Sequence, residues 1–117
     1  MAAPNVVNVA TITGKTAVQA VGTSATAIVT NSGGSGKVIK VNALYVSNVD
    51  GTSAADITAD LYRSSTAYRL ASTISVPADA TLDIISKSIY LEEGDSLRLT
   101  ASASGDLEAV CSYEEIS

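Results

Sequence analysis

The chain has 117 residues, of which 46% are hydrophobic, and its 12 acidic and 7 basic side chains give a net charge of −5. This length fits one domain with a single modest core. No cluster of Lys or Arg interrupts the acidic balance, and binding to nucleic acid or to an anionic membrane depends on such clusters. We therefore expect neither nucleic acid nor membrane as a partner.

The composition also limits the core. The chain contains no Phe, no Trp and no His, and its only aromatic residues are five Tyr. Large aromatic side chains normally contribute much of the area buried in a core. We therefore expect a thin domain that gains stability from neighbouring subunits.

The first residues are rich in small and β-branched side chains and alternate as a strand does. A strand whose two faces are alike is weakly specified within its own domain. We predict an extended N-terminal arm over residues 1–24, which pairs with itself or with a neighbour, and a β-sandwich domain over residues 25–117. A weakly ordered tail is the alternative. The larger apolar residues of this segment fall on both faces: Val6, Val9, Ile12 and Val18.

The glycine-rich stretch NSGGSGKV, residues 31–38, resembles part of a phosphate-binding loop. That motif needs a Gly, four residues, and then Gly-Lys-Ser/Thr. Asn31 stands where the first Gly belongs, and Val38 stands where the hydroxyl is required. A second candidate, Gly14-Lys15-Thr16, has the hydroxyl but finds Val9 at the first-Gly position. We interpret the stretch as a loop between strands, whose glycines permit positive φ.

From Lys37 onward the pattern predicts strands, because β-branched residues are frequent and apolar residues alternate with polar ones. Turn signals such as Asp50-Gly51 and Pro77–Asp79 separate the runs. About seven to eight antiparallel strands with turns every eight to twelve residues indicate an all-β fold, a single β-sandwich or jelly-roll-like domain. The predicted strands cover residues 37–49, 55–63, 67–76, 81–85, 88–91, 96–102 and 107–116.

The predicted core consists of the bulkiest residues on one face of each alternating strand. Such residues are placed in the core because one face of a sandwich strand packs on the opposite sheet. They are Ile57, Leu61, Leu70, Ile74, Leu82, Ile84, Leu97, Leu99 and Leu107.

The acidic stretch NVDGTSAAD has some of the oxygen ligands of a calcium-binding loop. It offers the oxygen atoms of Asn48, Asp50 and Asp56, but an EF-hand loop would also need an oxygen ligand at Val46 and a Glu at Ile57. Loop carboxylates of this kind are common turn residues. We predict no metal site and no cofactor.

We also predict no catalytic residues. Glu92-Glu93 and Glu114-Glu115 are adjacent on extended chain, so the two carboxylates of each pair point to opposite faces and do not converge on one bond. A Ser-centred triad has no histidine base. Cys111, the only cysteine, lacks a His partner and is interpreted as a small buried thiol that forms no internal disulfide.

The five tyrosines are scattered singly: Tyr45, Tyr62, Tyr68, Tyr90 and Tyr113. They are interpreted as structural residues at strand edges, and an exposed one could anchor an interface. A carbohydrate-binding jelly roll is a less favoured alternative, because no Trp is available as an aromatic platform.

From about residue 25 to the C-terminus, the sequence resembles small virion structural proteins of tailed phages, especially those of marine cyanophages. The resemblance rests on KVIKVNALYVSNVDGTSAADITADLYR, on TISVPADATLDII and on SIYLEEGDSLRLTASASGDLEAVCSYEEIS. Its most specific parts are LEEGDSLRLTAS and the terminal SYEEIS. The resemblance implies a β-sandwich protein of the particle without enzymatic activity, and it brings no catalytic residues to transfer.

The resemblance leads to the expectation of a capsid decoration or cement protein, and a neck, tail or fibre-attachment component is the alternative. The expected partners are further copies of the chain, as in a trimer, and another virion protein such as the major capsid protein. The chain lacks a basic region followed by an apolar block at its start. We therefore expect it to be made in the host cytoplasm without a signal peptide and to end in the virion.

Overall fold

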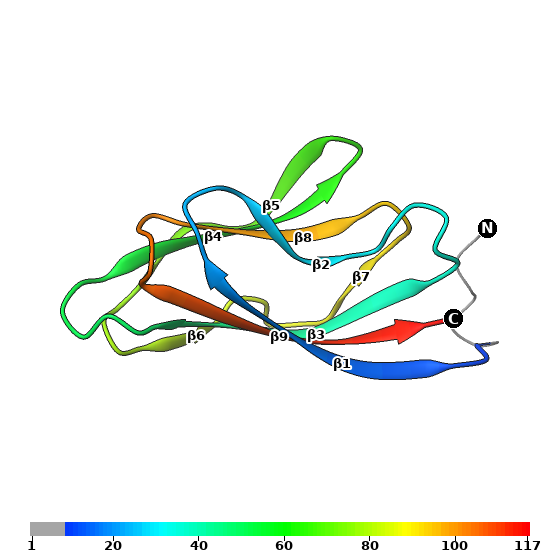
Figure 1. Ribbon diagram of the computed structural model, residues 1–117, viewed down its shortest axis with the longest axis horizontal. Helices are drawn as coiled ribbons and strands as arrows, with labels where there is room; N and C mark the ends of the chain where they lie inside the picture. The colour runs from blue at the N-terminus through cyan, green and yellow to red at the C-terminus, as the bar shows by residue number, and fades with distance from the viewer. Residues whose placement is uncertain (1–8) are drawn as a thin grey trace.

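The computed structural model describes residues 9–117, and this part of the chain forms nine β-strands and no helix (Figure 1). The strands lie in two stacked layers, which is how an alternating chain buries one face of each strand. They are β1 (Ile12–Val21), β2 (Thr26–Thr30), β3 (Val38–Asn48), β4 (Ala55–Arg63), β5 (Thr66–Val76), β6 (Thr81–Asp83), β7 (Ile89–Leu91), β8 (Ser96–Ala101) and β9 (Leu107–Ile116).

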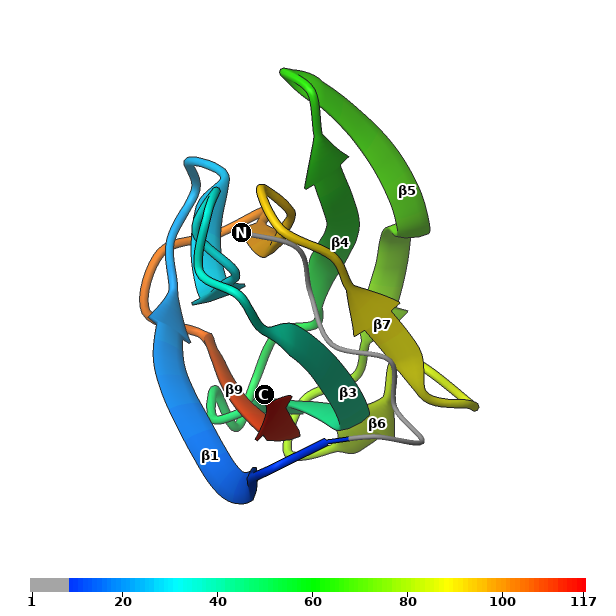
Figure 2. The same ribbon diagram turned by 90° about the vertical axis from the view of Figure 1, so that its right-hand side faces the viewer.

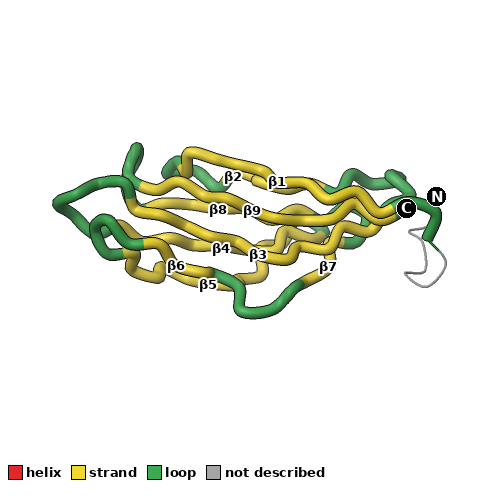
Figure 3. Tube along the Cα trace, turned by 90° about the horizontal axis from the view of Figure 1, so that it is seen from below, coloured by secondary structure: helices red, strands yellow, loops and turns green. Residues whose placement is uncertain are grey.

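The strands are divided between two antiparallel sheets. The first, called here the β1 sheet, has the order β1-β9-β3-β6, and β7 also pairs with β3. The second, called the β2 sheet, has the order β2-β8-β4-β5. Seen from below, the strands run along the long axis of the molecule (Figure 3), whose principal extents are 49 × 26 × 19 Å. The prediction of an all-β sandwich is confirmed.

The strand order is that of a jelly roll. The β4–β5 hairpin is the centre of a nested set of antiparallel pairs, in which β3 pairs with β6 and β7, β2 with β8, and β1 with β9. A long two-stranded ribbon that rolls up gives this order, which is why neighbouring pairs fall in different sheets. Nine strands form, rather than the expected seven to eight, because β1 and β2 precede the strands predicted from Lys37 onward.

The β4–β5 hairpin turns tightly at Ser64 and Ser65. Both residues have positive φ, 51° and 60°. A two-residue hairpin of the type I′ class requires this conformation, which matches the twist of the flanking strands. The end view shows the hairpin projecting past the rest of the sandwich (Figure 2).

The core lies between the two sheets. Four of the predicted core residues are fully buried there: Ile57, Leu97, Leu99 and Leu107. Three others are partly buried and pack against the core: Leu61, Leu82 and Ile84.

The prediction was wrong for Leu70 and Ile74, which are 37% and 43% exposed. Leu70 is the extra residue of a bulge in β5. Ala59 of β4 is opposite Ala71, and the next residue, Asp60, is opposite Arg69, so Leu70 has no partner in the register. Ile74 is opposite Ile57, but β5 is the edge of its sheet, so one side of Ile74 has no neighbouring strand. Bulges break a strict alternation, and the sequence pattern does not reveal them.

The predicted N-terminal arm also needs correction. Residues 12–21 form β1, which pairs with β9 of the same chain from Ile12 opposite Ile116 to Val21 opposite Leu107. Val21 belongs to the core. The inner face of β1 is otherwise made of short or amide side chains such as Ala17 and Gln19, so bulk alone did not reveal which face is inner. Residues 1–8 of the predicted arm lie outside the described residues.

Candidate interaction site

The glycine-rich stretch is the loop between β2 and β3, as predicted, and Asn31 fastens it to the turn at residues 92–95. The buried Asn31 side chain donates hydrogen bonds from Nδ2 to the carbonyl oxygens of Leu91 (3.0 Å) and Lys37 (2.9 Å). Its backbone N–H donates to the carbonyl of Asp95 (2.9 Å), and its own carbonyl accepts from the N–H of Gly94 (2.7 Å). The two loops therefore form one rigid end of the sandwich.

The groups that suggested a phosphate site have protein partners. Gly34 and Gly36 have positive φ, 74° and 70°. Glycine adopts this conformation without strain because it has no Cβ atom. The N–H of Gly36 donates to Oε2 of Glu93 (3.2 Å), and Nζ of Lys37 donates to Oε1 of Glu115 (3.0 Å). These polar groups of the loop therefore bind Glu93 and Glu115 of neighbouring segments.

The same turn holds an ion pair between β4 and the start of β8. Arg63 donates from Nε to Oδ1 of Asp95 (2.8 Å) and from Nη2 to Oδ2 (2.5 Å), and Nη2 also contacts Glu92 (2.8 Å). The backbone N–H of Glu92 donates to the Asp95 carboxylate as well (2.8 Å). The hydrogen bonds from Arg63 hold the pKa of the buried Asp95 below its usual value, although burial acts in the opposite direction.

Replacing Asp95 with Asn should destabilise the protein by about 2–3 kcal/mol at pH 7, less than a fully buried pair because Arg63 keeps contact with solvent. The folded-state pKa of Asp95 is depressed, so its contribution is present above its unfolded pKa of about 4 and is lost as pH falls through the folded pKa. The variant should therefore lose less stability than the parent on acidification below about pH 4. Denaturant unfolding between neutral and acid pH measures both effects.

Glu92→Gln is the matched control, because Glu92 contacts the same Arg63 from a largely exposed position. Exposed ion pairs contribute little to stability. Equal losses in the two variants at pH 7 would contradict the role given to Asp95.

Asn48 and Asp50, two of the possible calcium ligands, stabilise a turn after β3 instead. Nδ2 of Asn48 donates to the carbonyl oxygens of Ser53 and Val76, both at 2.9 Å. Oδ1 of Asn48 accepts the N–H of Asp50, and Oδ1 of Asp50 accepts two bonds from Thr52. Within residues 9–117, no group of three or more His, Cys, Asp or Glu side chains is arranged to hold a metal ion.

Three of the four paired glutamates, Glu92, Glu93 and Glu115, contact different partners. Glu115 binds Lys37 (3.0 Å) and Lys15 (3.2 Å), and the hydrogen bond from Lys37 is the main cause that lowers the pKa of the Glu115 carboxyl. Glu92 and Glu93 contact Arg63 and Gly36, as described above. Cys111 is buried, and this burial raises the pKa of its thiol to about 11. Its predicted place in the interior is confirmed.

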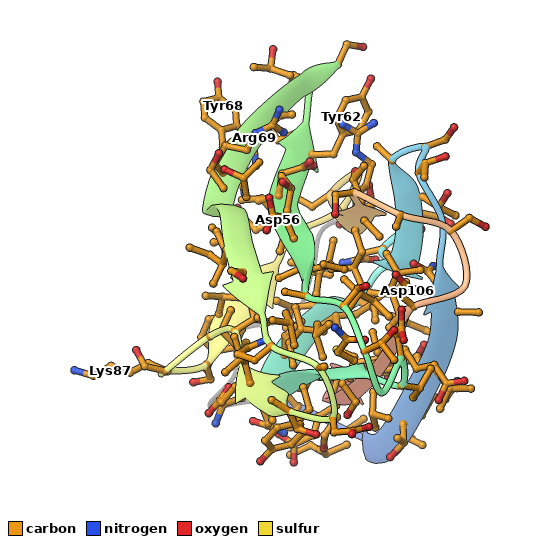
Figure 4. The ribbon with its side chains drawn as sticks, turned by 90° about the vertical axis from the view of Figure 1, so that its left-hand side faces the viewer. Asp56, Tyr62, Tyr68, Arg69, Lys87 and Asp106 are labelled. Carbon is orange, nitrogen blue, oxygen red and sulfur yellow. The ribbon has the colours of Figure 1, made fainter. Side chains whose placement is uncertain are left out.

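A polar cluster that the sequence did not indicate lies on the outer face of the β2 sheet. Asp60 is fully buried beneath Arg69 and Arg98, with Nη1 of Arg69 at 2.9 Å and Nε of Arg98 at 3.1 Å from its carboxylate oxygens. The Arg98 guanidinium stacks over the Tyr62 ring, 3.8 Å from its centroid. Tyr62 and Arg69 lie near the projecting hairpin in Figure 4, well away from Asp106. Finding this cluster from sequence requires the register of three strands.

The outer face of the β1 sheet carries an exposed apolar row. Val18 of β1 is opposite Val110 of β9, and Val110 is opposite Tyr45 of β3. Their exposed fractions are 75%, 42% and 45%. A shallow hollow of about 330 Å³ is lined by residues 18–20 of β1 and 108–110 of β9. Val18, Val110 and Tyr45 are called here the apolar row.

No protein-family model matches the chain, and no curated protein matches it. A solved structure is similar in fold, from a study entitled "Bacillus endospore appendages form a novel family of disulfide-linked pili". The match has a TM-score of 0.52 and 16% sequence identity, and it covers 92% of this chain and 88% of that chain. At this identity the likeness shows a shared fold alone. In the described part of the chain, no helix is long and apolar enough to cross a membrane.

Proposed function

We propose that the protein is a non-enzymatic structural subunit of a repetitive assembly, specifically a tailed-phage virion protein that decorates or cements the capsid. The observation that carries the proposal is the apolar row of Val18, Val110 and Tyr45 on an outer sheet face. A monomer gains nothing from such a row, whereas a subunit can bury it against a neighbour. Further copies of the chain and the major capsid protein are the proposed partners, as the resemblance implies.

The arrangement of polar groups supports a structural role. Several acidic and basic residues are bonded to one another across loops and strands, as in Asp95 with Arg63 and Asp60 with its two arginines. Networks of this kind fix the shape of a domain. A subunit that repeats on a lattice needs a fixed shape.

A filament subunit is the second candidate, because the similar solved structure comes from a study of pili. Those pili are described as disulfide-linked. Cys111 is the only cysteine of this chain, and it is buried with a raised thiol pKa. A filament of this protein would therefore need a linkage other than an intersubunit disulfide at Cys111.

Quantitative mass spectrometry of purified particles tests the proposal, with the major capsid protein as the internal standard. Capsid decoration predicts on the order of hundreds of copies per particle, because the lattice repeats the binding site, whereas a neck or tail ring predicts about six or twelve. Particles that lack the protein would contradict the virion proposal. Filaments of the purified chain in electron micrographs would favour the second candidate.

A further inference from the structure

The two sheets differ in how their edges are protected. An edge strand exposes unpaired N–H and C=O groups, and proteins usually shorten, bulge or charge such strands to prevent pairing with another chain. In the β2 sheet, the edge strand β2 has five residues and a register shift, and the edge strand β5 has two register shifts. At the far edge of the β1 sheet, β6 and β7 have three residues each.

Strand β1 is the exception among the described strands. It has ten residues, and its register with β9 runs from end to end without a shift. It contains no proline, and its one charged side chain, Lys15, is ion-paired with Glu115 of β9 at 3.2 Å. A long, regular edge without these protections favours the addition of another strand.

The side chains of β1 indicate what that added strand is. Val18 is the most exposed large hydrophobic residue among residues 9–117, and it lies on the outer face in the second half of β1. The hollow along β1 and β9 begins beside it. A strand that pairs with β1 should therefore carry a small apolar side chain opposite Val18. It should carry no positive charge opposite Lys15.

We propose that β1 of a second copy is this strand, paired antiparallel about a two-fold axis that passes midway between Val18 of one copy and Val18 of the other. A two-fold axis perpendicular to the sheet keeps outer faces on one side, so Val18 lies opposite the second copy's Val18. Lys15 then faces the second copy's Val21, and Ala17 faces its Gln19, so no like charges meet. This contact is isologous, and it does not depend on the proposed place in a virion.

The pairing would join the two apolar rows. Tyr45, Val110 and Val18 of one copy would continue directly into Val18, Val110 and Tyr45 of the other, across six strands of one continuous sheet. Registers centred one or two residues away would place Val18 opposite a smaller or polar residue of the second copy, namely Thr16, Gly14, Ala20 or Gly22. Cross-strand apolar pairs stabilise a sheet, and centring on Val18 sets the two bulkiest side chains of the outer face near this part of the edge against each other.

Sedimentation of the full chain over a range of concentrations tests the contact. The parent protein should form a dimer, and Val18→Lys should weaken dimerisation by about tenfold or more, because two like charges would face each other. Val49→Lys is the matched control, since Val49 is 51% exposed in the loop after β3. Circular dichroism of both variants checks that the sandwich still folds.

Chemical cross-linking gives a second, independent measurement. Because Cys111 is fully buried, Val18→Cys introduces the accessible thiol of the protein. Opposed Cβ atoms lie about 4.5–5.5 Å apart in an antiparallel pair, within reach of a short bis-maleimide. At low protein concentration, Val18→Cys should give a covalent dimer and Val49→Cys should remain monomeric. A concentration-independent monomer, a trimer, or a dimer that is unaffected by Val18→Lys and gives no cross-link would each overturn the proposal.

Discussion

Deleting residues 1–21 is expected to abolish cooperative folding of the domain. The deletion removes β1, and with it the ladder that runs along β9 from Ile116 to Leu107. It also removes the buried Val21 from the core and leaves β9 as a new, uncovered edge. A small domain has a narrow margin of stability, so the loss of an entire strand exceeds it.

Circular dichroism and thermal unfolding measure this effect. The truncated protein should lack a cooperative transition, and a synthetic peptide of residues 9–21 added in trans should restore one by pairing with β9. Val21→Asp should reproduce the loss in the full chain, whereas Val18→Asp should leave the monomer folded, because the two side chains lie on opposite faces of β1. A truncated protein with a normal transition would restore the interpretation of residues 1–24 as a dispensable arm.

This strand also shows why part of the fold could not be predicted. The sequence-based boundaries of β3, β4 and β9 lie within about one residue of those observed, because apolar and polar residues alternate along each strand and turn residues precede β4 and β9. On β1 the inner face is marked by Ala17, Gln19 and Val21, while the larger Val18 points to solvent. Alternation of bulk then gives no signal, and the inner face is fixed only by the partner strand β9.

Polar features were predictable from the sequence only where they depend on residues close together in the chain. The interpretation of NSGGSGKV as a loop followed from its own glycines. The burial of Asn31 depends on the carbonyl of Leu91, which is 60 positions away, and the burial of Asp60 depends on Arg98, 38 positions away. Such contacts follow from the nested order of the jelly roll, which a strand pattern does not specify.

Leu99→Ala and Ile74→Ala test whether the observed register is right. Both residues were placed in the core by the same alternation rule, but Leu99 is fully buried while Ile74 is 43% exposed on the edge strand β5. Leu99→Ala should reduce the free energy of unfolding by about 2–5 kcal/mol, because it removes apolar contacts and leaves a cavity between the sheets. Ile74→Ala should cost less than about 1 kcal/mol, because its side chain is already half in water.

Denaturant unfolding of the two variants under identical conditions gives the comparison, and equal slopes against denaturant concentration would show that the unfolded states are alike. Equal losses would mean that Ile74 is covered in solution, and a subunit seated against β5 would then be required. A loss at Leu99 below about half a kilocalorie, the range of surface substitutions, would place β8 one residue out of register. The expected difference arises because Leu99 lies between β4 and β2, with a strand on each side, whereas Ile74 has a strand on one side only.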